Sequence, residues 1–120
     1  MISLYEKFRR LLLLEIESLH DELELILTAL DDRLARHEIT EYVRNENVAV
    51  LRNELLGLED FLRDTFDPGA EDGASLEEIV DRTRAYLRRR MNDHEYVPAI
   101  YELVNGRIAK IVRYLESTAS

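Results

Sequence analysis

Residues 5–34 decide the fold, and they read YEKFRRLLLLEIESLHDELELILTALDDRL. The stretch has no proline or glycine, and the first glycine of the chain is Gly57. Apolar side chains recur at steps of three and four for about eight turns, which is typical of an α-helix with one packed side. The members of this stripe are Phe8, Leu12, Ile16, Leu19, Leu23, Ile26, Leu30 and Leu34. The sequence predicts a long N-terminal helix, which also carries leucines away from the stripe at positions 4, 11, 14 and 25.

A second apolar stripe predicts a second long helix up to residue 66. If the first helix simply continued, this stripe would be rotated by roughly 80° at 100° per residue. We therefore expect a break at residues 37–40, where His37 can adopt a turn conformation and Thr40 can cap a new helix. One bent helix of about sixty residues is the alternative, and it would be unusually long. The second stripe consists of Val43, Val50, Leu51, Leu55, Leu58, Phe61 and Leu62.

The second half of the chain predicts two shorter helices after a loop. Residues 67–74 read DPGAEDGA, a turn-rich sequence, and Ser75 with Glu78 forms a capping box for a third helix that ends near residues 92–93. A fourth helix opens at Pro98, and Asn105-Gly106 interrupts it, so that either close packing or a bend is expected there. The third stripe comprises Leu76, Ile79, Val80, Thr83, Leu87 and Met91, and the fourth comprises Ile100 or Tyr101, Val104, Ile108, Ile111 and Leu115.

These elements predict an all-α fold, an antiparallel four-helix bundle with two long N-terminal and two shorter C-terminal helices. The chain is expected to form a single helical domain over 1–120, with a long hairpin over 1–66, a loop over 67–74, a shorter helix pair over 75–116 and a tail over 117–120. At 1.5 Å per residue, the first two helices measure about 45 Å each and the last two about 27 Å each. The short helices cannot cover the long ones along their whole length, and the uncovered stripe predicts a homodimer or an obligate partner.

Composition and charge narrow the functional classes. The chain has no cysteine, and the apolar run 11–14 is too short for a signal peptide or a membrane span, so we expect a cytoplasmic protein without membrane contact. The net charge is −9, with −10 over residues 1–74 and +1 over residues 75–120. This acidity argues against nucleic acid as a partner. The asymmetry predicts that the two halves pack through complementary charges.

Four polar residues are candidates for partner or ligand binding. Asn47 and Glu54 lie one heptad apart inside the second apolar stripe, where a polar side chain needs a hydrogen-bond partner. They could form a polar spot that binds a partner or ligand. Alternatively, Asn47 fixes the helix register and Glu54 pairs with an arginine of a facing helix. Glu17 and His20 form one E-x-x-H half-motif, whereas di-iron bundles need two of these motifs and two further glutamates.

The remaining motifs do not indicate an enzyme. No pair of histidines has the spacing of a zinc helix, and nucleophile-elbow and phosphate-loop patterns are absent from the sequence. We expect no catalytic residues, no metal and no cofactor. Three consecutive arginines at 88–90 point in different directions around a helix and are interpreted as a solvated helix end.

Two functional hypotheses follow. The long acidic helices broadly resemble those of bacterial secretion chaperones of the flagellar export type in length and character, without a shared motif. This resemblance implies a chaperone-like or scaffold role. The first hypothesis is therefore a protein–protein interaction or assembly module that forms a homodimer. The alternative is a bundle that binds a metal or small ligand, with or without enzymatic activity, around Glu15, Glu17, His20, Asn47 and Glu54.

Overall fold

The structure, a computed structural model, describes residues 2–63, 73–94 and 98–118. Within these ranges it consists of four α-helices and no strand: α1 (Leu4–Ala35), α2 (Glu41–Arg63), α3 (Leu76–His94) and α4 (Pro98–Thr118). The predicted all-α fold is confirmed, and α1 and α2 are the longer pair, with 32 and 23 residues against 19 and 21. Most of the predicted loop 67–74 lies outside the described residues. No described helix is both long enough and apolar enough to cross a bilayer.

The predicted break between α1 and α2 is confirmed, and backbone hydrogen bonds define it. His37 has a φ of 60°, a left-handed conformation that few residues other than glycine adopt. The amide of Glu38 donates to the carbonyl of Arg33 at 2.9 Å, and the amide of His37 donates to Leu34 at 3.0 Å. This pair of bonds is a Schellman motif, which satisfies the last carbonyls of α1. Thr40 then accepts the amide of Val43 at 3.2 Å and caps α2, so the long segment is two helices.

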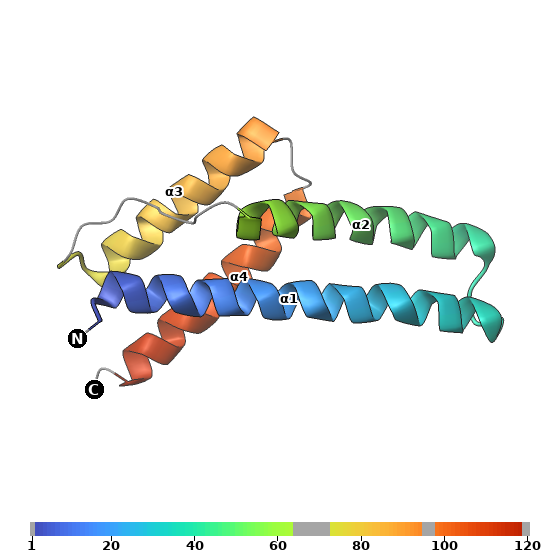
Figure 1. Ribbon diagram of the computed structural model, residues 1–120, viewed down its shortest axis with the longest axis horizontal. Coiled ribbons are helices and arrows are strands. Elements are labelled where there is room, and N and C mark those ends of the chain that lie inside the picture. Colours follow the sequence, from blue (N-terminus) through green and yellow to red (C-terminus); the bar gives the residue numbers. More distant parts are fainter. Residues whose placement is uncertain (1, 64–72, 95–97, 119–120) are drawn as a thin grey trace.

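The four helices form two layers of unequal length. α1 and α2 form an antiparallel hairpin, and α4 crosses behind it at an oblique angle, with α3 beside α4 (Figure 1). The second layer covers the part of the hairpin that holds the N-terminal half of α1 and the C-terminal half of α2. Among the described residues, no third helix lies over the part next to the hairpin turn (Figure 1). We call this uncovered part the distal half of the hairpin.

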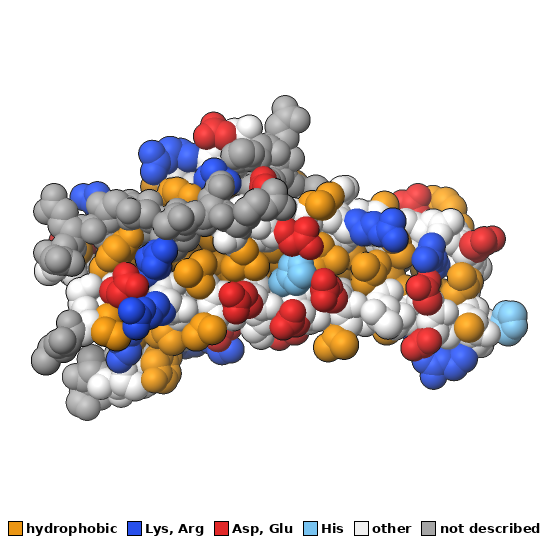
Figure 2. Space-filling model, viewed as in Figure 1, with side chains coloured by type: hydrophobic (Ala, Val, Ile, Leu, Met, Phe, Trp, Pro, Cys, Tyr) orange, Lys and Arg blue, Asp and Glu red, His pale blue; other side chains and the backbone are white. Residues whose placement is uncertain are grey.

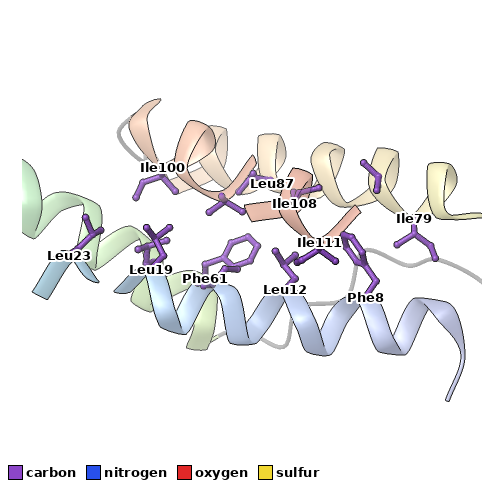
Figure 3. Close-up of a cluster of buried hydrophobic side chains, with 14 of the residues drawn as sticks. Phe8, Leu12, Leu19, Leu23, Phe61, Ile79, Leu87, Ile100, Ile108 and Ile111 are labelled. Atoms are coloured by element: carbon purple, nitrogen blue, oxygen red, sulfur yellow. The ribbon is translucent and has the colours of Figure 1, made fainter. Parts of the chain in front are cut away.

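The hydrophobic core lies between the two layers in the covered half. In Figure 3, Ile100 in the first turn of α4 lies close to Leu19 and Leu23 of α1, which marks how far α4 reaches along α1. Phe61 of α2 contacts Tyr86 of α3 edge-on, with ring centroids 6.0 Å apart. The core comprises Phe8, Leu12, Ile16, Leu19, Leu23, Leu55, Leu58, Phe61, Ile79, Val80, Leu87, Ile100, Val104, Ile108, Ile111 and Leu115.

The predicted stripes of α1 and α2 are wrong at three distal positions. Ile26, Val43 and Val50 are exposed, because α3 and α4 end before they reach the distal half. Val48, which was not in the predicted stripe, is buried instead. It follows Arg44 by four residues, and Arg44 pairs with Asp31 of α1, so Val48 lies on the side of α2 that faces α1.

The predicted stripes of α3 and α4 are confirmed, and the interruption in α4 is resolved. Ile79, Val80, Thr83 and Leu87 are buried in α3, and the five predicted aliphatic positions from Ile100 to Leu115 are buried in α4. Ser75 accepts the amide of Glu78 at 3.2 Å, as expected of an N-cap. α4 runs without a break through Gly106, which is exposed, and a Cβ atom there would meet nothing within 4 Å. Close packing therefore does not explain this glycine.

The two described glycines make a matched pair for a stability test. Gly106→Ala is expected to raise the free energy of unfolding by about 1 kcal/mol, because alanine loses less backbone entropy in a helix. Gly73→Ala also has open space around its Cβ, but Gly73 has a φ of 87°, so that substitution should lower stability by about 1 kcal/mol. Urea denaturation of both variants measures the two shifts. A loss of stability in Gly106→Ala would contradict the continuous helix.

Candidate functional site

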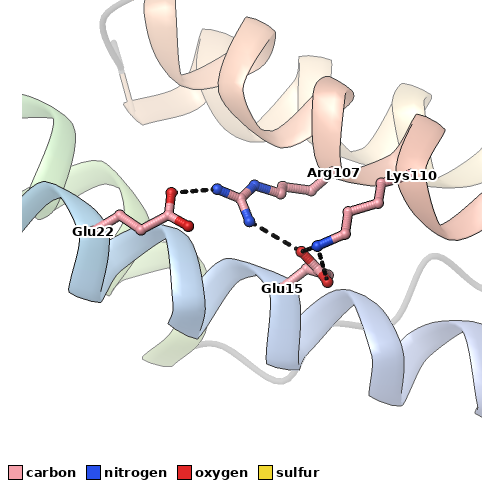
Figure 4. Close-up of polar contacts among 4 residues, drawn as sticks. All are labelled: Glu15, Glu22, Arg107 and Lys110. Atoms are coloured by element: carbon pink, nitrogen blue, oxygen red, sulfur yellow. Dashed lines mark hydrogen bonds and ion pairs between the residues drawn. The ribbon is translucent and has the colours of Figure 1, made fainter.

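A charged cluster fixes α4 against α1. Arg107 of α4 bonds to Glu15 at 3.1 Å through Nη1 and to Glu22 through Nη2, and Lys110 lies 3.0 Å from the other oxygen of Glu15 (Figure 4). Two cations from the second half of the chain thus meet two carboxylates from the first half. The predicted charge complementarity between the halves is confirmed at this contact.

Glu15 is held in its charged form by this cluster. Burial by itself raises the pKa of Glu15, but the hydrogen bonds and positive charges of Lys110 and Arg107 outweigh burial, and the pKa lies below its ordinary value. A carboxyl group with a lowered pKa in the folded state stabilises the fold at neutral pH. Glu15 is a candidate ligand residue in the sequence, but in the structure its carboxylate pairs with Arg107 and Lys110 and stabilises the contact between the two layers.

The same contacts show which side of α1 faces the second layer. Glu15 and Glu22 lie on that side, because both bond to Arg107 of α4. Ile26 follows Glu22 by four residues and therefore lies on the same side, one turn farther along the hairpin. Its side chain is 50% exposed. Arg33 follows Ile26 by seven residues and continues this side of α1 to the hairpin turn.

Two series of residues spaced seven apart show which side of α2 faces the second layer. The first series contains Phe61, Glu54 and Asn47, and Phe61 contacts α3. The second series contains Gly57, Val50 and Val43. Gly57 is buried, whereas the side chains of Val50 and Val43 are 55% and 40% exposed. Residues seven apart lie on nearly the same side of a helix. Val43, Asn47 and Val50 therefore extend the covered side of α2 into the distal half, where nothing among the described residues covers them.

We call the surface formed by Ile26, Val43, Asn47 and Val50 the distal face. It has the same orientation as the side of the hairpin that packs on α3 and α4. Leu23, Leu30 and Val48 are buried between α1 and α2 in this half. The distal face is therefore an apolar surface on an ordered two-helix layer.

Asn47 and Glu54 were predicted as a buried polar spot, and only part of that picture is found. Asn47 is exposed, and its side-chain amide donates to the carbonyl of Val43 in its own helix at 2.8 Å. Glu54 is half-buried at the edge of the second layer, where burial raises its pKa. The predicted burial of Asn47 is wrong, because α3 and α4 do not extend that far. No ion pair links Glu54 to an arginine among the described residues.

Glu17 and His20 do not act as a unit in the structure. Glu17 is exposed, whereas His20 is half-buried and its Nε2 lies 3.0 Å from Glu59 of α2. Nδ1 of His20 lies 3.7 Å from Glu24 and 3.9 Å from Asp21. Figure 2 shows a histidine side chain among acidic side chains near the middle of the face turned to the viewer.

His20, Asp21 and Glu24 have the spacing of metal ligands. One ligand atom from each lies within 4.8 Å of the others. The Nδ1–oxygen distances exceed a hydrogen bond and approach the separation of about 3.4 Å that follows from zinc–ligand bonds of about 2.1 Å in a tetrahedron. Glu59 can accept the Nε2 proton, which leaves Nδ1 free to coordinate. The i, i+4 spacing of His20 and Glu24 could have been recognised in the sequence as a possible pair of ligands. The contact of Glu59 with His20 depends on the packing of α2 and could not.

A groove of about 580 Å³ also lies between α3 and α4. Its walls combine aliphatic side chains such as Val80 and Val112 with charges of both signs, including Glu77, Arg84 and Arg113. Arg84 is engaged there with Asn105, at 2.8 Å. The groove therefore holds dispersed charges, and these do not converge on one point as in a small-molecule site.

Comparison with known proteins adds no functional assignment. No protein-family model, no curated protein and no solved structure matches this chain. Function must therefore be argued from the surfaces of the molecule.

The charged cluster predicts a pH-dependent contribution to stability. Glu15→Gln is expected to lower the free energy of unfolding at pH 7 by about 1.5–3 kcal/mol, the usual value for hydrogen bonds to charged groups. Because the folded pKa of Glu15 is lowered, wild type has the full contribution above the unfolded pKa and loses it as the pH falls through the folded pKa. Urea denaturation of both proteins between pH 7 and about pH 3 should therefore show a difference that shrinks on acidification.

Glu17→Gln is the matched control, because Glu17 is exposed on the same helix two residues away. It should leave stability nearly unchanged at both ends of the pH range. A Glu15→Gln difference that stays constant with pH would show that the charge of Glu15 is not what stabilises the contact.

Proposed function

We propose that the protein is a protein–protein interaction or assembly module that self-associates through the distal face. The observation that carries this proposal is the exposure of Ile26, Val43 and Val50 on the sides of α1 and α2 that α3 and α4 cover elsewhere. Exposed apolar side chains that continue a core face are typical of surfaces that bind another protein. A scaffold or chaperone-like role would use the same surface.

A second copy of the chain is the occupant that best matches the distal face. In the covered half, the hairpin is completed by a layer of two further helices, α3 and α4. The hairpin of a second copy offers a two-helix layer of the same kind, so two distal halves together would form a four-helix arrangement. A two-fold axis between them would make the contact closed and self-complementary.

The size of the distal face predicts a weak dimer. The uncovered part of α1, from about Leu23 to Ala35, spans about 18 Å at 1.5 Å per residue. Two helices side by side are about 20 Å wide. This footprint is smaller than the roughly 800 Å² per partner of a standard interface, so the dimer should dissociate on dilution.

A second candidate function is metal binding at His20, Asp21 and Glu24. The observation that favours it is the set of distances around Nδ1 of His20, which suit a zinc-type ion. Within the described part of the chain, the ion pairs of Asp21, Glu24 and Glu59 all lead to His20. A divalent ion would reduce this excess of negative charge. Glu24 points about 200° around α1 from Glu22, which faces α4, so the site lies away from the distal face and metal binding and self-association can be tested separately.

Self-association is tested by light scattering after size exclusion over a range of protein concentrations. Wild type should shift from monomer toward dimer as concentration rises, whereas Ile26→Asp and Val50→Asp should stay monomeric, because a buried unpaired carboxylate opposes association. Leu25→Asp is the matched control: Leu25 is 71% exposed and points about 100° away from Ile26.

Leu25→Asp should associate like wild type. Circular dichroism must show that all three variants keep their helix content. A wild type that stays monomeric at the highest concentration would overturn the proposal, as would an equal loss of association in Leu25→Asp.

Metal binding is tested by calorimetric titration of untagged protein with Zn²⁺. We expect one saturable site in wild type and at least tenfold weaker binding in His20→Gln and Glu24→Gln, since each substitution removes a ligand. His37→Asn serves as control, because His37 lies at the hairpin turn and asparagine tolerates its positive φ. Unchanged binding in His20→Gln would exclude this site.

A further inference from the structure

The contacts between α1 and α2 fix how the distal face is arranged along the hairpin. Arg44 pairs with Asp31 at 2.8 Å, and Glu59 contacts His20 at 3.0 Å, so each residue of α2 can be placed beside a residue of α1. Interpolation between these contacts places Glu54 beside about residue 24 of α1 and Asn47 beside about residue 29, at 1.5 Å per residue for both helices.

The two charged residues at the margins of the distal face have opposite signs. Arg33 lies at the end next to the hairpin turn, on the same side of α1 as Ile26. Glu54 lies at the other end, where the second layer stops. They are separated by about 14 Å along the hairpin, at 1.5 Å per residue. The apolar side chains of Ile26 and Val50 lie between them.

We propose that two copies of the chain pack distal face to distal face with their hairpins pointing in opposite directions, so that Arg33 of each copy pairs with Glu54 of the other. This inference rests on the proposed self-association and specifies its geometry. A two-fold axis that runs across both hairpins, midway between Arg33 and Glu54, stacks α1 on α1 and α2 on α2. It places each arginine at the level of the other copy's glutamate, which lies on the neighbouring helix of the facing layer. Packing with both hairpins in the same direction would instead place Arg33 beside Arg33 and Glu54 beside Glu54, which like charges oppose.

Asn47 lies near the centre of this arrangement. The midpoint between Arg33 and Glu54 is beside about residue 28 or 29 of α1, which is the level of Asn47. Asn47 of one copy would therefore lie close to Asn47 of the other, within a mainly apolar contact. A single polar residue in such a position sets the register of helix packing, because a shift would bury its side-chain carbonyl oxygen without a hydrogen-bond donor.

The present surroundings of the two charged residues favour the pairing. Arg33 is exposed and pairs only at 3.4 Å with Glu38 of the same chain, so its side chain can turn to a partner at little cost. Glu54 is partly desolvated, burial raises its pKa, and no cation accompanies it among the described residues. A cation from a second copy would offset this unfavourable burial.

The test is a charge exchange measured by analytical ultracentrifugation at low ionic strength. Arg33→Glu and Glu54→Arg alone should each raise the dimer dissociation constant at least tenfold, because each creates two like-charge contacts per dimer. The double variant Arg33→Glu/Glu54→Arg restores opposite charges in the opposed arrangement and should return to within about threefold of wild type. In the parallel arrangement, either single variant would exchange one like-charge contact for another, so neither Arg33→Glu nor Glu54→Arg would weaken the dimer tenfold.

Arg36→Glu combined with Glu54→Arg is the matched control, because Arg36 lies beyond Arg33 at the turn and is also exposed to solvent. This pair should not restore association. A double variant Arg33→Glu/Glu54→Arg that stays weak, while Ile26→Asp still abolishes the wild-type dimer, would overturn the opposed arrangement and leave the distal face as the interface. A wild type that never dimerises would overturn the proposed function itself.

The absence of cysteine from the chain permits a second measurement that does not alter charge. Asn47→Cys should form a disulfide-linked dimer on mild oxidation, since Cα atoms across the axis must come within about 7 Å for that bond. Leu25→Cys, away from the distal face, should form little. Equal cross-linking at both positions would show that the contact at Asn47 is not specific.

Discussion

The length of α1 is the constraint on which the rest of the structure depends. A helix of 32 residues presents one apolar side over its whole length, and that side must be covered for the hairpin to be stable. α2 runs antiparallel from the turn and covers one flank of α1 as far as its 23 residues reach, to about the middle of α1 (Figure 1). The other flank receives α3 and α4 only as far as about Leu23, where α4 begins. The charged cluster around Arg107 holds the second layer at the N-terminal part of α1, so the distal half is left as two helices. The exposed apolar surface of the distal half is thus a direct result of unequal helix lengths.

Much of the fold could be predicted because it depends on periodicity and local chemistry. The break at His37 and Thr40, the cap at Ser75 and the start at Pro98 each reflect backbone preferences within a few residues. The buried positions of α3 and α4 followed from spacing alone, because these short helices are covered along their whole length. Even the mismatch in length could be read from the sequence. These features can be predicted without knowing which helix packs against which.

The candidate site was less predictable because it depends on contacts between distant parts of the chain. Periodicity identifies the apolar side of a helix but does not show where a partner helix stops, so Ile26 and Val50 were assigned to the core. The same limit applies to Asn47, which lies on the predicted side of α2 but beyond the reach of α3. His20 gave a different error, because its E-x-x-H spacing pointed to Glu17 while packing placed Glu59 next to it. Arg33 had no distinguishing feature until the orientation of the distal face was known.

The tight turn at His37 also has a consequence for the order of folding. Its hydrogen bonds join residues only three to five positions apart, and the contacts of the hairpin grow outward from it. Such local contacts form quickly, before the long-range contact of Arg107 with Glu15, which closes a loop of about ninety residues. During synthesis the hairpin is complete before α4 emerges from the ribosome. For that interval the flank of α1 that later packs on α3 and α4 is open to solvent along its whole length. The charged residues of α4 then close the N-terminal part of this flank, and the apolar side chains of the distal half stay exposed.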